Sequence, residues 1–266
     1  MSSASWSAYA DTRPGALVQD AVRRAIETMW KHYGEPVSLS DLADAAILSR
    51  FYFSRVFRQV TGTSPGRFLS AVRLHQAKEL LRESELSVTG ISYQVGYNSP
   101  GTFTSRFTRS VGLSPTRYRD HARLADSGSL PRPPRPGPHG GTVVGTVLRA
   151  GVVPLRNVYV GAFTSSVPEG RPVAWDVLGP GRRRFQLHGV PDGTWHIRVA
   201  GLDGSPPEYG TERRMLVGTG PAVTVQTRGA IEVDITLRPS GVFDLPVLFA
   251  LPELDCRDQR LMAGAC

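Results

Sequence analysis

The sequence predicts a multidomain α and β fold, with an all-α domain followed by an all-β sandwich domain. Up to about residue 125 apolar residues recur at helical spacing, whereas after residue 142 short runs such as TWHIRVAG (194–201) alternate with Gly, Pro and Asp turns, as strands do. Between them SGSLPRPPRPGPHGG (127–141) is rich in proline, which fits neither a helix interior nor a sheet interior. We expect an α domain over 12–125, a Pro/Gly-rich linker over 126–141, a β-sandwich over 142–240 and a tail over 241–266.

A near-repeat divides the helical part. SRFYFSRVFRQVTGTSPGRF (49–68) and SPGTFTSRFTRSVGLSPTRYR (99–119) align with an offset of 50 residues. The alignment pairs Phe53 with Phe103, Phe57 with Phe107, Gly62 with Gly112, Ser64-Pro65 with Ser114-Pro115, and Phe68 with Tyr118. A repeat of this length indicates that one structural unit is built twice.

Capping signals place the helices of each copy. Ser38, with Asp41 three residues later, is typical of a capping box at a helix start. Ser49 and Ser99 stand where the second helix of each copy should begin. Gly62 and Gly112 stand where that helix should end, and Ser-Pro then begins a third helix. Each copy is therefore predicted to be a helix-turn-helix unit, and the α domain a double helix-turn-helix domain.

A helix-turn-helix unit sets its second helix into the major groove of DNA. The two phenylalanines of each copy, four residues apart, are expected to face the local core and leave a polar face outward. Arginine on such a face can read guanine or grip phosphates. The candidate DNA-binding residues are Arg50, Phe51, Tyr52, Ser54, Arg55 and Arg58 in the first copy, and Ser99, Gly101, Thr102, Ser105, Arg106 and Arg109 in the second.

The segment between the copies, from Pro65 to about Arg82, is predicted to be one long helix. At about 1.5 Å per residue it spans about 27 Å, and with the flanking units it approaches one DNA turn of about 34 Å. Two recognition helices could then enter successive major grooves without dimerisation. The alternative is that the aromatic repeat is only the core of a bundle or solenoid, although two copies are few for a solenoid.

Charge supports a polyanionic partner for the helical part. Residues 12–125 hold 16 basic and 9 acidic residues, a balance of +7 within the overall +8. A cationic surface concentrated on one segment most often binds nucleic acid. The alternative is a solvated surface that serves solubility.

The second copy, GYNSPGTFTSRFTRSVGLSPTRYR (96–119), strongly resembles the AraC/XylS family of transcription regulators, and the first copy is similar. The pattern is Gly, an aromatic residue, a capping Ser, two Phe four apart, Gly, Ser-Pro, an aromatic residue and Arg. The resemblance covers about residues 17–122 and implies seven helices with two helix-turn-helix units. It further implies base contacts from Phe51, Ser54 and Arg55, then from Gly101 and Ser105, with Arg106 as an additional candidate.

The sequence departs from the family pattern at three points. Ile47 stands where the first turn often has glycine, so that turn is expected to be less regular. Ser105 aligns with Arg55, so the second copy is expected to read fewer bases, with Arg106 meeting phosphate. The double helix-turn-helix precedes the second domain, whereas many relatives carry it behind a sensor, so the resemblance does not extend to the family's sugar pocket.

The strand-rich part resembles carboxypeptidase-regulatory or transthyretin-like β-sandwiches. The marks of that pattern are Gly145, Val147, Pro154, Leu155, Val158, Val160, Phe185, Leu187, Val190, Pro191, Gly193 and Trp195. This domain could sense a small molecule, dimerise or dock a partner. Four aromatic residues could line a pocket or belong to the core, namely Tyr159, Trp175, Trp195 and Tyr209.

Other candidate sites in this part are weaker. His188 and His196 flank one turn, but two histidines without Cys or carboxylate support do not predict a metal. The run from Arg182 to Arg184 suits a solvated loop, with DNA phosphate as the alternative. Cys256 and Cys266 near the end of the tail could form a redox switch or stay unused thiols.

No motif of an enzyme, cofactor site or signal peptide is present, so we predict neither catalysis nor a cofactor. The function that the sequence favours is a cytoplasmic, sequence-specific transcription regulator without membrane contact. Its predicted partners are double-stranded DNA at promoter sites, RNA polymerase, and an effector or a second copy bound through the β domain. One alternative is an architectural DNA-binding protein with low sequence specificity; another, a carrier or adhesion protein, is disfavoured by the missing signal peptide.

Overall fold

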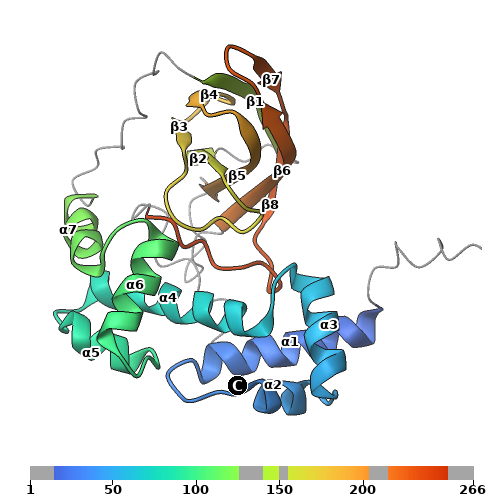
Figure 1. The fold of residues 1–266 in the computed structure, drawn as a ribbon, viewed down its shortest axis with the longest axis vertical. Helices are drawn as coiled ribbons and strands as arrows, with labels where there is room; N and C mark the ends of the chain where they lie inside the picture. Colours follow the sequence, from blue (N-terminus) through green and yellow to red (C-terminus); the bar gives the residue numbers. More distant parts are fainter. Residues whose placement is uncertain (1–14, 126–139, 150–154, 204–214, 251–266) are drawn as a thin grey trace, which may run out of the picture. The chain divides into compact units, whose positions relative to one another are not determined.

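The computed structural model describes residues 15–125, 140–149, 155–203 and 215–250 (Figure 1). The chain divides into two compact units, residues 1–73 with 242–245 and residues 74–241 with 246–266. Several sequence-based expectations lie outside the described residues: those for the linker over 126–139, Pro154, Tyr209, Cys256 and Cys266. The predicted domain boundaries therefore stay a prediction.

The first unit holds α1 (Ala16–Lys31), α2 (Leu39–Ala46), α3 (Arg50–Thr61) and the start of α4 (Pro65–Glu83). Each of the first three helices buries one apolar face, and α1 packs against both α2 and α3. Arg24 of α1 donates to the carbonyl oxygens of Ala45 and Ala46, at 3.3 and 3.1 Å. These bonds satisfy carbonyls that the end of α2 leaves without a helical partner.

The predicted capping box begins α2. Ser38 Oγ accepts from the backbone N–H of Asp41 at 3.2 Å, and the Asp41 carboxylate accepts from the N–H of Ser38 at 2.7 Å. The backbone bond first, and then the side-chain bond, hold the pKa of the Asp41 carboxyl below its ordinary value. Because that pKa is lowered by folding, the stabilisation is present at neutral pH and is lost as acid protonates the carboxyl.

The second unit holds the end of α4 together with α5 (Val88–Gln94), α6 (Pro100–Val111) and α7 (Pro115–Ala125). Ser87 and Ser99 cap α5 and α6 through their hydroxyl oxygens. Gly62 ends α3 and Gly112 ends α6, both left-handed with φ of 74° and 88°, as predicted. Ser49 also occupies its predicted N-cap position, but its side chain makes no capping hydrogen bond.

The turns inside the two copies differ. Ile47, two residues before Ser49, ends α2 in the left-handed region with φ of 58°, while the left-handed residue in the turn of the second copy is Gly96, three residues before Ser99, with φ of 82°. A β-branched side chain is strained in this region because its Cβ crowds the backbone. The first turn therefore has a residue in the left-handed region although it lacks the glycine.

Eight strands follow in the second unit: β1 (Gly141–Arg149), β2 (Leu155–Phe163), β3 (Ala174–Leu178), β4 (Arg184–Val190), β5 (Gly193–Asp203), β6 (Met215–Val225), β7 (Ala230–Glu232) and β8 (Ile235–Pro239). They form one sheet in the order β3-β2-β5-β6-β8-β1-β4, with β7 paired to β1. This continuous path is a nearly closed, barrel-like sheet, which differs from the predicted sandwich of two facing sheets. Strand pairing is non-local, so the alternation of residues did not specify it.

A buried carboxylate joins the two ends of this path. Asp176 of β3 is 3% exposed and accepts a hydrogen bond from the N–H of Gln186 on β4 at 3.0 Å. It also accepts from the N–H of Val177 and from the Arg182 guanidinium, both at 2.8 Å. Because a buried carboxylate is costly unless it is paired, these bonds favour the approach of β3 to β4.

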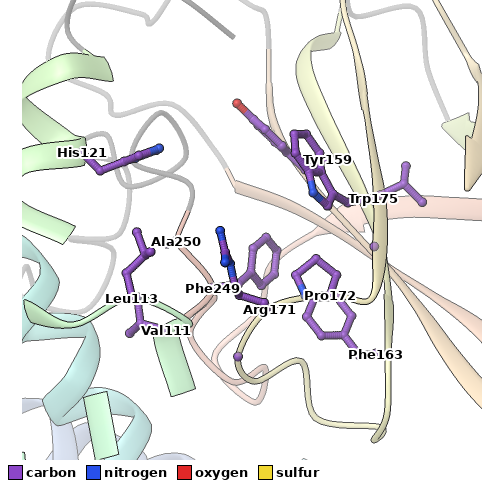
Figure 2. A pocket seen from close by; sticks show the side chains of 13 residues that line it. Val111, Leu113, His121, Tyr159, Phe163, Arg171, Pro172, Trp175, Phe249 and Ala250 are labelled. Atoms are coloured by element: carbon purple, nitrogen blue, oxygen red, sulfur yellow. The ribbon is translucent and has the colours of Figure 1, made fainter. Parts of the chain in front are cut away.

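Side chains alternate between the two faces of the sheet, as they must in a strand. On the outer face, Tyr159 and Phe163 of β2 pack with Phe249 from the segment after β8 (Figure 2). The rings of Phe163 and Phe249 lie 5.5 Å apart. The outer face of β2 is therefore covered by side chains from the end of the described chain.

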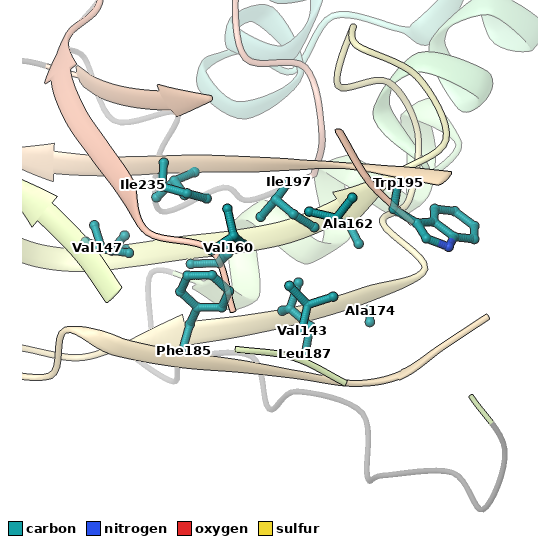
Figure 3. Close-up of a cluster of buried hydrophobic side chains, with 14 of the residues drawn as sticks. Val143, Val147, Val160, Ala162, Ala174, Phe185, Leu187, Trp195, Ile197 and Ile235 are labelled. Carbon is teal, nitrogen blue, oxygen red and sulfur yellow. The ribbon is translucent and has the colours of Figure 1, made fainter. Parts of the chain in front are cut away.

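The inner face forms the main core of the barrel (Figure 3). Phe185 and Leu187 of β4 meet Val160 of β2, Ile197 of β5 and Ile235 of β8 there, all nearly or fully buried. Trp195 also belongs to this core, and its indole N–H donates to the carbonyl of Pro191 at 2.7 Å.

Among the described ranges, no group of three or more His, Cys, Asp or Glu side chains could hold a metal ion. The described helices include none that is long and apolar enough to cross a bilayer.

We predict that Ile47→Gly raises the free energy of unfolding. The substitution relieves left-handed strain of about 1–2 kcal/mol and costs about 0.5–1 kcal/mol of backbone entropy, so the expected gain is about 0.5–1 kcal/mol. Ile47 is 79% exposed, so little burial is lost. Urea unfolding followed by circular dichroism measures the change. Ile47→Ala keeps a Cβ and should show almost no gain, and equal stabilisation by both variants would contradict the strain.

Candidate nucleic-acid interface

Three buried aromatic rings anchor α3 to α4 in the first copy. Phe53 packs edge-on against Phe57 with ring centroids 5.4 Å apart, and Phe57 packs against Phe68 of α4 at 5.6 Å. All three side chains are fully buried. Edge-to-face packing of this kind adds to the energy of burial and fixes which face of α3 points outward.

The second copy repeats this arrangement with one more ring. Tyr97 packs on Phe103, Phe103 on Phe107, and Phe107 on Tyr118 of α7, at centroid distances of 5.4, 5.6 and 5.7 Å. Phe103, Phe107 and Tyr118 are fully buried. The aligned aromatic positions of the repeat therefore have the same role in both copies, and each set of rings fixes the outward face of its own helix.

The outward face of α3 carries the residues that the sequence analysis singled out. Arg50, Phe51, Tyr52, Arg55 and Arg58 are exposed, and Ser54 is half-buried. Phe51 is 91% exposed although it lies two residues from fully buried Phe53. The Arg55 guanidinium lies 5.2 Å from the centre of the Tyr52 ring, a cation–π contact that restrains it near the start of the helix.

The outward face of α6 carries smaller and more polar side chains than that of α3. Ser99, Gly101, Thr102, Ser105, Arg106 and Arg109 are all exposed. Ser99 Oγ accepts from the N–H of Thr102 at 3.3 Å, so this oxygen is engaged in capping. A Cβ added at Gly101 would meet open space apart from the Ser99 hydroxyl. The start of α6 therefore offers a bare backbone where α3 offers an aromatic ring.

These two faces suit different contacts with a duplex. Arginine can donate two hydrogen bonds to guanine, and an exposed phenylalanine can contact a thymine methyl group. Small hydroxyl side chains and Gly101 allow the backbone at the start of α6 to come close to the duplex.

The aromatic residues singled out in the β-rich part lie at two different places. Tyr159 and Trp175 line a cavity, whereas Trp195 is in the barrel core. Of the arginine run, Arg182 is paired with Asp176 and Arg184 with Glu232 at 3.3 Å. The sequence analysis did not find the other residues of the cavity, because they come from segments far apart in the chain.

The helical region is similar to known regulators. Residues 42–121 match the family model described as a helix-turn-helix domain. An uncharacterized HTH-type transcriptional regulator of Haemophilus influenzae is 44% identical over 86 residues, 32% of this chain and 29% of that protein. The HTH-type transcriptional activator RhaS of Escherichia coli O1:K1 is 38% identical over 88 residues, 33% of this chain and 32% of that protein.

Among solved structures, the DNA-binding domain of the global transcriptional factor AdpA in complex with a target DNA is 31% identical. The match covers 43% of this chain and all of that chain, with a TM-score of 0.38. The chain spans about a third of the length of the curated relatives named above. Those relatives are described as regulators and activators of transcription and not as enzymes.

The resemblance of the helical part to helix-turn-helix regulators of transcription is thus confirmed. The resemblance of the strands to transthyretin-like domains is not confirmed and stays a prediction.

We predict that Gly101→Ala separates helix stability from DNA contact. Gly101 and Gly66 each follow a proline that begins a helix, and each has open space for a Cβ. Replacement by alanine should therefore stabilise either helix by up to about 0.5–1 kcal/mol. If the start of α6 meets DNA closely, only Gly101→Ala should also lower DNA affinity, by about five- to tenfold. Thermal unfolding and fluorescence anisotropy with labelled DNA measure the two effects; unchanged affinity would place Gly101 outside the interface.

Proposed function

We propose that this protein is a sequence-specific DNA-binding transcription regulator in which α3 and α6 are the two recognition helices. The observation that carries the proposal is the doubled unit, in which buried aromatic rings fix one face and polar groups occupy the other. The match of residues 42–121 to a helix-turn-helix domain supports the same conclusion.

In this proposal the two helices read one asymmetric site from successive major grooves. The helix that connects the copies along the chain, α4, has 19 residues and is about 28 Å long. Phe51, Ser54 and Arg55 contact bases in the first half-site, supported by Arg50, Tyr52 and Arg58. Gly101 and Ser105 contact bases in the second, and the remaining candidates hold phosphates: Ser99, Thr102, Arg106 and Arg109.

The β-rich part modulates this binding in the proposal, by sensing an effector, by dimerisation or by docking a partner such as RNA polymerase. Activation is favoured over repression because the relative RhaS is named as an activator. We place the protein in the cytoplasm, where promoter DNA is accessible. The domain boundaries of 12–125 and 142–240 remain part of the proposal, as does a transthyretin-like origin of the strands.

An architectural role with low sequence specificity is the second candidate. It is favoured by the basic excess of the helical part, which suits phosphate contacts of any sequence. The difference between the outward faces of α3 and α6 favours sequence-specific binding instead, because a protein that binds DNA of any sequence does not need two different recognition helices.

We predict that Arg55→Ala lowers affinity for the preferred DNA site by about 1–3 kcal/mol and leaves non-specific binding nearly unchanged, because a base contact is lost. Arg106→Ala should weaken binding on all sequences and reduce the salt dependence by about one phosphate contact. Arg183→Ala, on an exposed turn of the β-rich part, is the control. Anisotropy titrations on specific and scrambled duplexes at several salt concentrations separate these results. Equal weakening of both duplexes by Arg55→Ala would reassign Arg55 to phosphate.

A further inference from the structure

A cavity of about 190 Å³ lies within the second unit, between the end of the second helix-turn-helix copy and the outer face of the sheet (Figure 2). Its walls are mainly apolar and include four aromatic side chains, Tyr159, Phe163, Trp175 and Phe249, of which all but Trp175 are nearly fully buried. An apolar cavity of about 150 Å³ is large enough for benzene. The space therefore suits a molecule with one ring and a small substituent.

Two basic side chains interrupt the apolar walls. His121 of α7 points its imidazole toward the side of Tyr159 and Trp175, and its Nδ1 is buried without a hydrogen-bond partner among the described residues (Figure 2). Arg171, in the loop before β3, lines the cavity with an exposed side chain. A guanidinium binds a carboxylate through paired, charge-assisted hydrogen bonds, and a buried polar atom without a partner calls for a ligand or water.

The same loop completes the end of α6. The last carbonyls of a helix lack helical partners, and here Ser110 O accepts from the N–H of Gly170 at 2.8 Å. Val111 O accepts from the N–H of Ala250 at 2.9 Å. Residues 170 and 250 both line the cavity, so the walls of the cavity hold the end of a proposed recognition helix.

The side chain of Arg171 also lies close to the end of α6. A Cβ at Gly112, which ends α6, would lie 2.7 Å from Cγ of Arg171. The stem of Arg171 therefore packs directly on the helix end, while its guanidinium is available to the cavity.

A buried cation provides a second connection. Lys78 of α4 donates to the carbonyl oxygens of Val247 and Phe249 at 3.1 and 3.4 Å, and its Nζ lies 5.6 Å from the centre of the Tyr118 ring. Tyr118 in turn packs on Phe107 of α6. A displacement of Phe249 would thus be transmitted to α6 through the contacts of Lys78 and Tyr118.

We propose that this cavity binds a small monocyclic carboxylic acid, held by Arg171 and His121 between the aromatic walls, and that its binding changes the DNA affinity of α6. The second part rests on the proposed function. The ring fills the apolar space, the carboxylate pairs with the Arg171 guanidinium, and the imidazole supplies the remaining hydrogen bond. Because the walls of the cavity also cap α6, a ligand that moves the loop at 170–172 alters that cap.

The first test is calorimetric titration of the full chain with benzoate, phenylacetate and the neutral benzyl alcohol. We expect saturable binding of one acid per chain, with benzyl alcohol weaker by about tenfold. Arg171→Met keeps the stem that packs on Gly112 and should weaken benzoate by about tenfold without changing benzyl alcohol. Arg183→Met is the matched control and should change neither. Absence of binding at about 10 mM acid, or acid binding indifferent to Arg171→Met, would overturn the ligand class.

The second test measures DNA affinity with and without saturating benzoate. We expect a change of about fivefold or more in the wild type, and a clearly smaller change in Arg171→Met at a benzoate concentration that saturates only the wild type. Benzoate binding without any change in DNA affinity would overturn the coupling. A chain that binds benzoate but no DNA would instead contradict the proposed function and leave the ligand site supported.

Discussion

The helical part depends on one kind of contact. An aromatic ring of α3 packs on a ring of α4, and an aromatic ring of α6 packs on a ring of α7. Phe57 packs on Phe68 and Phe107 on Tyr118, at 5.6 and 5.7 Å. For these rings to meet, the chain must reverse within a few residues, and the left-handed glycine at the end of each helix permits that reversal. The polar face of α3 and of α6 then points outward, because the opposite face of each helix is buried in the core.

Much of the helical part could be predicted because its determinants are local. Capping serines, helix-ending glycines and phenylalanines four apart act within one or two turns of their own position, so spacing alone locates them. Ser49 shows the limit, since its position was predicted but its hydroxyl makes no cap. Whether a side chain adopts the capping rotamer depends on surroundings that the sequence does not reveal.

The β-rich part was predictable as strands but not as a barrel. The first strand pairs with β4, β7 and β8, which follow it by about 40 to 90 residues, and no local pattern specifies partners so distant. The carboxylate of Asp176, which draws β3 to β4, looks in the sequence like any exposed acid. The cavity was invisible for the same reason, because its walls come from α6, α7, three parts of the sheet region and the segment after β8.

In this account one chain carries two different DNA-recognition helices, α3 and α6. The most direct test is selection of bound sequences from a random DNA pool by the full chain. The account predicts one asymmetric motif in two parts, centred about one helical turn apart, with the part read by α3 more stringent than the part read by α6. A palindromic motif, or no motif together with a steep loss of binding in salt, would contradict it.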